Sequence, residues 1–387
     1  MNFELDETEE AVRDLARQIL GDATSFERTR EVEADADGPG YDRALWSQLA
    51  ESNLVGVAID EAFGGQGMSF LSLALLLEEA GRALAPVPLA ESIVHAALPI
   101  QAFGSDEARK TFLPPFAAGE TLLVAALFET GTPFPGRRVR TRASSDGAGG
   151  YRLSGGKVCV PFAAEAEAVV VSAADDAGLG LFLVSPTAEG VRLERQQTTA
   201  HERQYVMTLD DAPVAAERVL APPGRGEAAL EWLEPRAATA LAAVAVGAAE
   251  EGLRQTAEYT RARKQFGREI GSFQGVSLRA ADAYIDVEAM RSTLWQAAWQ
   301  IDHREDAAKA AAVAKWWACT GGHRVSHTCQ HLHGGIGADI EYPIHRYFLR
   351  LKHVAMTLGG ASEQLAGLGD RIAAEATAGR AVEEILS

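Results

Sequence analysis

Three histidines in the last third of the chain have the spacing of a metal site. His323, His327 and His331 follow one another at intervals of four residues, which places them on one face of a helix. No carboxylate or thiolate stands at a matching position to complete a ligand set. We therefore predict no metal site.

Two further stretches carry residue types that suit ligand binding. Glycines 334, 335 and 337 fit a loop in which backbone approaches a ligand closely, although a turn that simply ends a helix uses the same residues. The run from Arg261 to Arg268 is basic in a chain whose formal net charge is −18. It is either an anion-binding stretch or the solvated end of a helix.

The elements that must position these residues change in type along the chain. Residues 3–116 have a helical pattern of apolar residues, with expected helices at 41–55 and 71–84. Short β-branched runs at 121–128, 151–160, 168–172, 181–184 and 205–209 follow, separated by Gly, Asp and Pro. Long Ala-rich helices then extend to about residue 264 and over 272–303, 304–330 and 343–358, with Pro235 expected in a first helical turn.

This order predicts a mainly α protein with a central β domain. We expect a helical domain over 1–120, an antiparallel β-barrel or sandwich over 121–225 and a helical bundle over 226–387.

Composition limits the possible partners and compartments. The strong negative charge disfavours nucleic acid and anionic membranes, and no apolar run is long enough for a membrane span. Three cysteines without a CxxC pair, and no apparent targeting segment, point to a reducing compartment. We expect the protein in the cytoplasm.

Three segments together resemble the acyl-CoA dehydrogenase family. They are "YTRARKQFGREIGSFQ" at 259–274, "HLHGGIGADIEYPIHRYFLRLK" at 331–352, and "LVGVAIDEAFGGQGMSF" at 54–70 followed by "LEEAGRAL". The resemblance implies N-terminal helical, middle β and C-terminal four-helix domains, assembled as a tetramer with FAD held between subunits. It also implies a reaction in which a carboxylate removes the α-proton of an acyl-CoA thioester while a hydride leaves the β-carbon for the flavin.

The resemblance assigns cofactor contacts to the basic stretch and the glycine loop. Arg263 matches the arginine that reaches the pyrophosphate of a neighbouring subunit's FAD, a contact that suits the forked guanidinium. His331 stands where the family usually has glutamine, with Gln330 beside it. The other expected flavin contacts are Gln265, Phe266, Gln274, Gly334 and Gly335.

The middle domain departs from the family pattern. Relatives carry "TEPxxGSD" and "KxWITN" segments that bind the flavin ring of the same subunit, whereas this chain has "FETGTPFPGRR" and "GGKVCVPFA". Cys159 and Pro161 thus replace tryptophan and threonine, and a proline offers neither an N–H nor a hydroxyl. The chain's own half of a flavin site is predicted to be eroded.

The family's catalytic carboxylate is also missing. The usual position corresponds to Leu358, or to Gly359 after a one-residue insertion. The alternative position, counted from Gly247, corresponds to Ala237 beside Ala238. Glu234 is nearby but turned elsewhere on a continuous helix, and Glu363 fits better as a helix-start acid.

These features suggest the non-catalytic partner of a heteromeric acyl-CoA dehydrogenase, whose Arg263 and glycine loop complete FAD sites in a base-bearing subunit. The chain resembles the base-lacking subunits of actinobacterial α2β2 enzymes that act on steroid side chains. Two alternatives remain open: a self-tetramer that uses Glu234 as a relocated base, and a flavin-free scaffold. An acyl-CoA substrate and an electron-transferring flavoprotein as acceptor are expected from the family.

Overall fold

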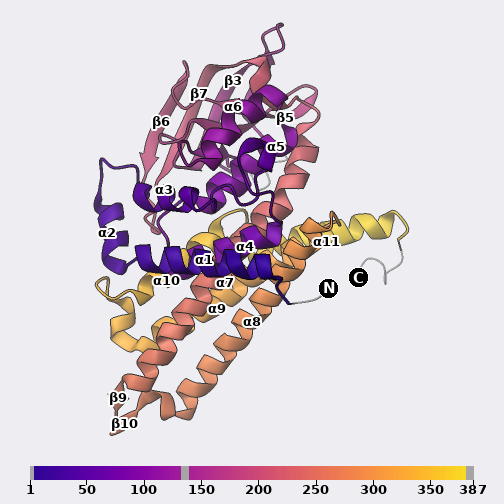
Figure 1. Cartoon of the computed structure of the whole chain (residues 1–387). Helices are drawn as coiled ribbons and strands as arrows, with labels where there is room; N and C mark the ends of the chain where they lie inside the picture. Colours follow the sequence, from indigo (N-terminus) through magenta and orange to yellow (C-terminus); the bar gives the residue numbers. More distant parts are fainter. Residues whose placement is uncertain (1–3, 132–138, 381–387) are drawn as a thin grey trace.

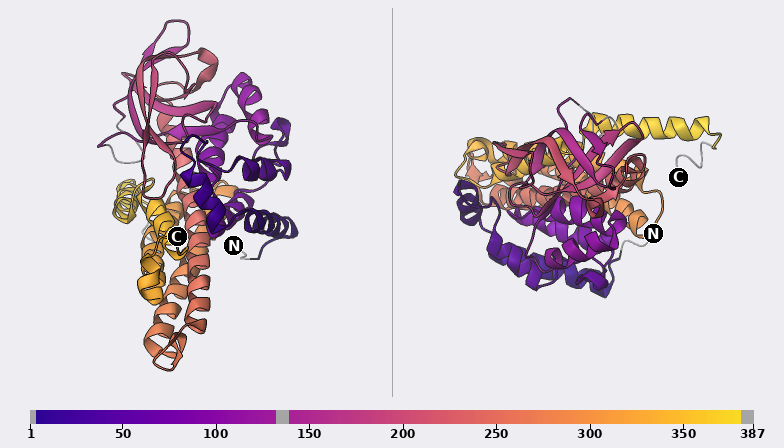
Figure 2. Two further views of the ribbon diagram at one scale, coloured as in Figure 1. Left: turned by 90° about the vertical axis from the view of Figure 1, so that its left-hand side faces the viewer. Right: turned by 90° about the horizontal axis from the view of Figure 1, so that it is seen from above.

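The computed structural model describes residues 4–131 and 139–380. A β-sheet occupies one end of the molecule and long helices extend from it to the other end, with the N-terminal helices along one side (Figures 1 and 2). The fold is therefore mainly α with a central sheet, as the sequence predicts.

The N-terminal third is helical because its short elements are capped and amphipathic. The Asp6 side chain accepts a hydrogen bond from Glu9 N (2.8 Å) and the Glu9 carboxylate accepts one from Asp6 N (2.9 Å), which closes a capping box. The α-helices of this part are α1 (Glu7–Ala23), α2 (Phe26–Ala34), α3 (Arg43–Glu51), α4 (Phe70–Ala83), α5 (Leu98–Phe103) and α6 (Asp106–Ala117). A π-helical segment, Ala90–Ala97, leads directly into α5.

The middle of the chain forms one eight-stranded sheet with the order β6-β7-β3-β2-β4-β5-β8, and β1 pairs with β4. Its strands are β1 (Leu123–Ala126), β2 (Arg142–Ser145), β3 (Tyr151–Pro161), β4 (Ala168–Asp175), β5 (Gly178–Val184), β6 (Val191–Gln196), β7 (Gln204–Val214) and β8 (Val219–Ala221). Most pairs are antiparallel, but β1 and β2 each pair with β4 in parallel. The sheet is therefore mixed. Strands β2, β6 and β8 were not predicted from the sequence.

The C-terminal helices are α7 (Gly226–Ala262), α8 (Gln274–Asp302), α9 (Ala308–His333), α10 (Ile344–Met356) and α11 (Ala361–Thr377). A two-stranded hairpin, β9 (Lys264–Gln265) and β10 (Arg268–Glu269), joins α7 to α8. α11 projects from the body of the molecule in the view from above (Figure 2). Among the described residues, no helix is both long and apolar enough to cross a membrane.

The expected place of Pro235 in a first helical turn is wrong. α7 already begins at Gly226, so Pro235 lies in its interior. The start is fixed by packing against the sheet, because a Cβ on Gly226 would lie 2.6 Å from Leu179 O. The helix therefore continues through Pro235, although an interior proline removes one backbone hydrogen bond and crowds the carbonyl four residues earlier.

Two glycines let the N-terminal and C-terminal helices cross in close contact. A Cβ on Gly247 of α7 would lie 1.7 Å from Glu78 O, and one on Gly81 of α4 would lie 2.1 Å from Val244 O. Beside this crossing, Arg291 of α8 is ion-paired with Glu78 and with Glu250. These contacts fix α4, α7 and α8 as one packed unit that supports the hairpin.

Candidate functional site

The hairpin between α7 and α8 lies at the end of the bundle farthest from the sheet (Figure 1). Gln265 pairs with Arg268, and the two residues between them, Phe266 (φ 53°) and Gly267 (φ 79°), both have positive φ. This is the backbone of a two-residue hairpin turn. Residues 261–269 are all exposed, so the hairpin presents its side chains to molecules outside the chain.

The backbone of Arg263 is fixed by two hydrogen bonds, while its side chain extends from the hairpin into solvent. Its N–H donates to Tyr259 O (2.8 Å) and its carbonyl accepts from Ile270 N (2.8 Å). Within the described part of the chain, its guanidinium makes no hydrogen bond or ion pair. A positioned guanidinium of this kind can bind phosphate oxygens without first breaking an internal contact.

The remaining residues expected on the hairpin side are also exposed. Phe266 is 93% exposed, and its ring lies edge-on to that of Phe273 at 6.2 Å between ring centroids. Gln265 donates to its neighbour's carbonyl, Lys264 O (2.7 Å), and Gln274 is the first residue of α8. No side chain caps this helix start, so the N–H groups of its first residues can donate hydrogen bonds to an anionic or carbonyl group of a ligand.

Apolar exposure continues from the hairpin along α8. Leu278 (56% exposed) and Ile285 (63% exposed) are seven residues apart and share one face of the helix. These two residues give α8 an exposed apolar stripe. Such a surface is typical of a protein interface.

The glycine loop follows α9 and is held against the end of α7. His333 stacks on Tyr259 at 4.4 Å, and Gln330 Nε2 donates to Gly337 O (3.2 Å). A Cβ on Gly337 would lie 2.5 Å from Gln330 O, whereas one on Gly334 or Gly335 would meet nothing within 4 Å. Internal packing therefore requires a glycine at position 337. Beside Gly334 and Gly335, by contrast, the chain leaves open space.

The histidine stripe has contacts of its own. The rings of His323 and His327 are 4.2 Å apart, and Lys352 Nζ lies 2.7 Å from His323 Nδ1. No group of three or more metal-ligating side chains occurs among the described residues. His331 lies exposed in the last turn of α9, next to the glycine loop where the resemblance expects a cofactor contact.

The usual base position is buried and apolar. Leu358 is 2% exposed and forms a left-handed turn with Gly359 (φ 59° and 84°) between α10 and α11. Lys315 Nζ fixes this turn by donating to Val354 O (2.9 Å) and Gly359 O (3.2 Å). Glu363 accepts from Gly360 N (2.8 Å), which confirms its interpretation as a helix-start acid.

The alternative base position is equally apolar. Ala237 and Ala238 are 0% and 4% exposed in the core face of α7. Glu234 forms an ion pair with Arg371 of α11 (3.3 Å). Its role as a relocated base stays a prediction.

A buried ion pair between Glu129 and Lys157 links the two segments at which the family resemblance predicts flavin-ring contacts. Glu129 accepts from Lys157 Nζ (2.7 Å), from Thr141 Oγ1 (2.6 Å) and from Arg140 N (2.6 Å). Burial lowers the pKa of Lys157 to about 8 against the opposing effect of Glu129. Residues 132–138, where the "GSD" element would be expected, lie outside the described residues.

Downstream of Lys157 the strand does not retain its family residues. Cys159 has positive φ (54°), and its N–H donates to the Gln196 side chain (2.9 Å). Burial, and then the charge of Glu202, raises the pKa of the Cys159 thiol. Glu202 therefore lies near the strand on which the family resemblance predicts contacts to the flavin ring.

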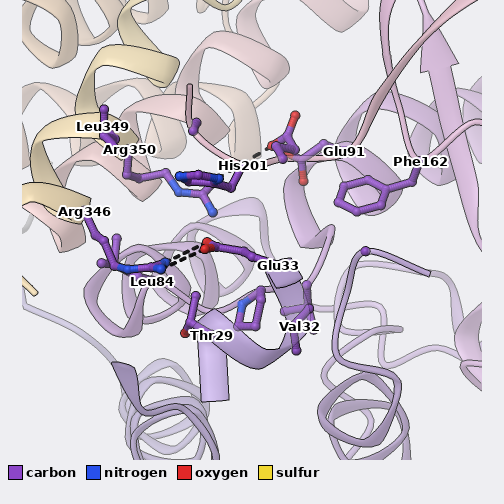
Figure 3. A pocket seen from close by; sticks show the side chains of 15 residues that line it. Thr29, Val32, Glu33, Leu84, Glu91, Phe162, His201, Arg346, Leu349 and Arg350 are labelled. Carbon is purple, nitrogen blue, oxygen red and sulfur yellow. Dashed lines mark hydrogen bonds and ion pairs between the residues drawn. The ribbon is translucent and has the colours of Figure 1, made fainter. Parts of the chain in front are cut away.

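Glu202 belongs to a charged cluster that the sequence analysis missed. It accepts from His353 Nε2 (3.2 Å) and lies 3.7 Å from Arg350 NH1, both on α10. Glu202 and Arg350 line a surface cleft together with Glu91, which comes from the π-helical segment (Figure 3). Burial and then the charge of Glu202 raise the pKa of Glu91 to about 7, whereas His353 and Arg350 hold the pKa of Glu202 at about 2 despite its burial. No spacing signal could have united these residues, because they come from three distant segments.

Comparison with known proteins identifies the family. Residues 6–120 match the acyl-CoA dehydrogenase N-terminal domain and residues 226–373 match the acyl-CoA dehydrogenase C-terminal domain. The chain belongs to the acyl-CoA dehydrogenase family. Its sequence is 35% identical over 382 residues to acyl-CoA dehydrogenase FadE27 of Mycobacterium tuberculosis, covering 96% of this chain and 99% of the relative. It is 34% identical to FadE28 of the same organism, covering 89% of this chain and 98% of the relative.

Two solved structures are similar to almost the whole chain. A variant of the Tcur3481-Tcur3483 steroid acyl-CoA dehydrogenase is 46% identical with a TM-score of 0.90, covering 96% of this chain and 99% of that one. The ChsE4-ChsE5 complex of M. tuberculosis is 36% identical with the same TM-score and the same coverage. Both names describe assemblies of two different chains.

Proposed function

We propose that this chain is the non-catalytic partner in a heteromeric acyl-CoA dehydrogenase and completes the FAD site of a homologous, base-bearing subunit in an α2β2 assembly. One observation carries the proposal: both predicted base positions, Leu358 and Ala237, are buried and apolar, while Arg263, Gly334 and Gly335 are exposed. A subunit built in this way lacks the group that removes a proton. It keeps exposed groups that can contact a cofactor seated in another subunit.

FAD fits the chemistry of these residues. The Arg263 guanidinium suits a pyrophosphate, the uncapped start of α8 at Gln274 offers N–H donors, and Gly334 and Gly335 leave room for a ligand to approach the backbone. When bound, FAD accepts the hydride that leaves the substrate. This chain's residues bind and orient it, with Gln265, Phe266 and His331 as further contacts.

We extend the proposal to the substrate and the acceptor. Similarity to the steroid acyl-CoA dehydrogenase and to the ChsE4-ChsE5 complex supports a sterol-derived acyl-CoA thioester as the substrate. An electron-transferring flavoprotein is the proposed electron acceptor, since the family generally uses one.

Expression of the chain alone and together with a base-bearing homologue tests the role. We expect the chain alone to purify without stoichiometric flavin and to show no acyl-CoA-dependent dye reduction. Co-expression should yield a yellow complex that reduces the dye. Stoichiometric flavin and turnover in the single chain would instead favour a homomeric enzyme, in which Glu234→Gln should abolish activity.

A further inference from the structure

A second cleft opens between the N-terminal helices and the C-terminal bundle. It lies between α1, α2, α4, α7 and α10 and has a volume of about 370 Å³, which is within the range of small-molecule sites. None of the residues that line it is a cofactor contact or a base position in the proposed function. A ligand site in this cleft therefore goes beyond that function.

Two arginines of this cleft share one buried glutamate. Glu79 of α4 is 2% exposed and accepts hydrogen bonds from Arg17 Nε (3.1 Å), Arg17 Nη2 (2.8 Å) and Arg82 Nε (2.9 Å). Arg82 is also ion-paired with Glu250. The side chain of Arg17 is half-exposed and has no other acceptor within residues 4–131 and 139–380. Its Nη1 group can therefore donate to a ligand without breaking the pair with Glu79.

A third arginine of the cleft joins α10 to α2. Arg346 donates to the two carboxylate oxygens of Glu33 (2.6 and 2.7 Å; Figure 3), and its guanidinium lies over the Phe26 ring at 5.1 Å. Arg346 Nε and Thr24 Oγ1 are buried, and neither has a hydrogen-bond partner among the described residues. Buried polar atoms rarely lack a partner, so two such atoms on residues of one cleft point to a bound molecule that hydrogen-bonds with them.

The charge and the apolar surface of the lining together indicate the class of ligand. The lining has three arginines and two carboxylates, which are Arg17, Arg82, Arg346, Glu79 and Glu251. Because Arg82 and Arg346 also pair with carboxylates outside the lining, Arg17 is the arginine best placed to bind a further anion. A guanidinium binds a carboxylate through parallel hydrogen bonds. Apolar surface beside the arginines, which favours burial of a hydrocarbon skeleton, comes from Leu20, Phe26, Leu84 and Pro343.

We propose that this cleft binds a small amphipathic organic anion, a carboxylate on an apolar skeleton, with Arg17 as the main contact to the carboxylate. Thr24 and Arg346 supply further hydrogen bonds. Such a ligand touches α1 and α10 at once, and so links the N-terminal domain to the C-terminal bundle.

Fluorescence titration with 1-naphthoate, on the full chain in whichever assembly it purifies, tests the proposal. This probe is a carboxylate on an apolar two-ring skeleton, and 1-naphthamide is its uncharged analogue. We expect a saturable site for 1-naphthoate and at least tenfold weaker binding of 1-naphthamide. The absence of a saturable site, or equal binding of the two compounds, would overturn the proposal.

Two variants assign the site to the cleft by independent means. Gly21 of α1 lines the cleft, and a Cβ added there meets nothing within 4 Å, so Gly21→Phe should fold and occupy part of the space. It should abolish the site, whereas Gly21→Ala should keep it. Arg17→Met leaves Glu79 paired with Arg82 and should weaken binding at least tenfold. Arg13→Met is its matched control, because Arg13 lies on the same helix, pairs with Asp14 (2.9 Å) and does not line the cleft. Wild-type affinity in both Gly21→Phe and Arg17→Met would overturn the proposal.

Discussion

Leu358 and Ala237 occupy the two positions at which the family resemblance predicts a general base, and neither side chain can take a proton. Loss of a positioned base lowers a rate by a factor of roughly 10²–10⁴, which for a weak carbon acid removes useful turnover. At the same scale, Arg263, Gly334 and Gly335 keep the residue types that suit a cofactor. The proposed function therefore assigns cofactor contacts to this chain and proton removal to another subunit.

Two glycines of one loop should respond differently to alanine. Gly337→Ala places a Cβ 2.5 Å from Gln330 O and should destabilise the fold by about 1–3 kcal/mol in a denaturant titration. Gly335→Ala meets nothing within 4 Å and should leave the free energy of unfolding unchanged. In the assembled complex, Gly335→Ala should nonetheless weaken FAD retention, and equal retention in this variant and the wild type would argue against a close approach of the cofactor.

At the scale of elements, the hairpin, the start of α8 and the loop after α9 are exposed, and the Tyr259–His333 stack holds that loop against the end of α7. The sequence predicted these segments because their motifs are local and their residue types are specific. It could not predict the cluster of Glu91, Glu202, Arg350 and His353, whose members meet only through tertiary packing. The start of α7 was misplaced for a related reason, since contact of Gly226 with β5 fixes it.

The hairpin gives a sharp test of cofactor contact. Arg263→Ala should cost at least tenfold in FAD retention on dilution of the complex, because it removes a charge-assisted contact worth about 1.5–3 kcal/mol. Arg261→Ala, a neighbouring exposed arginine, is the matched control and should retain FAD. The two variants should unfold at the same temperature, and equal FAD retention in both would remove the case for a phosphate contact.

At the scale of the whole molecule, all three domains contribute to the cluster of Glu91, Glu202, Arg350 and His353, so pH should act on their junction. The pKa of Glu91 is raised to about 7 by burial and by Glu202, so between its ordinary pKa and about 7 the folded state binds the extra proton. Its contribution to stability is therefore present at low pH and is lost as pH rises through about 7. The facing groups His95, Arg350 and His353 remain the same in a Glu91 variant.

Glu91→Gln, which stays neutral, should gain stability relative to the wild type as pH rises. We expect the difference in free energy of unfolding to grow by about 1–3 kcal/mol between about pH 5 and about pH 8, as urea titrations can measure. Glu33→Gln should show no such growth, because Glu33 pairs with Arg346 and is not a member of this cluster. A difference for Glu91→Gln that is constant with pH would contradict the assigned protonation.

The central claim is that this chain completes a cofactor site in another subunit and holds none of its own. Native mass spectrometry of the complex with a base-bearing homologue, with flavins counted per chain, tests it most directly. The account predicts one FAD for each pair of unlike chains, and loss of that FAD on Arg263→Ala in this chain alone. One FAD for every chain, or a flavin count unaffected by Arg263→Ala, would contradict it.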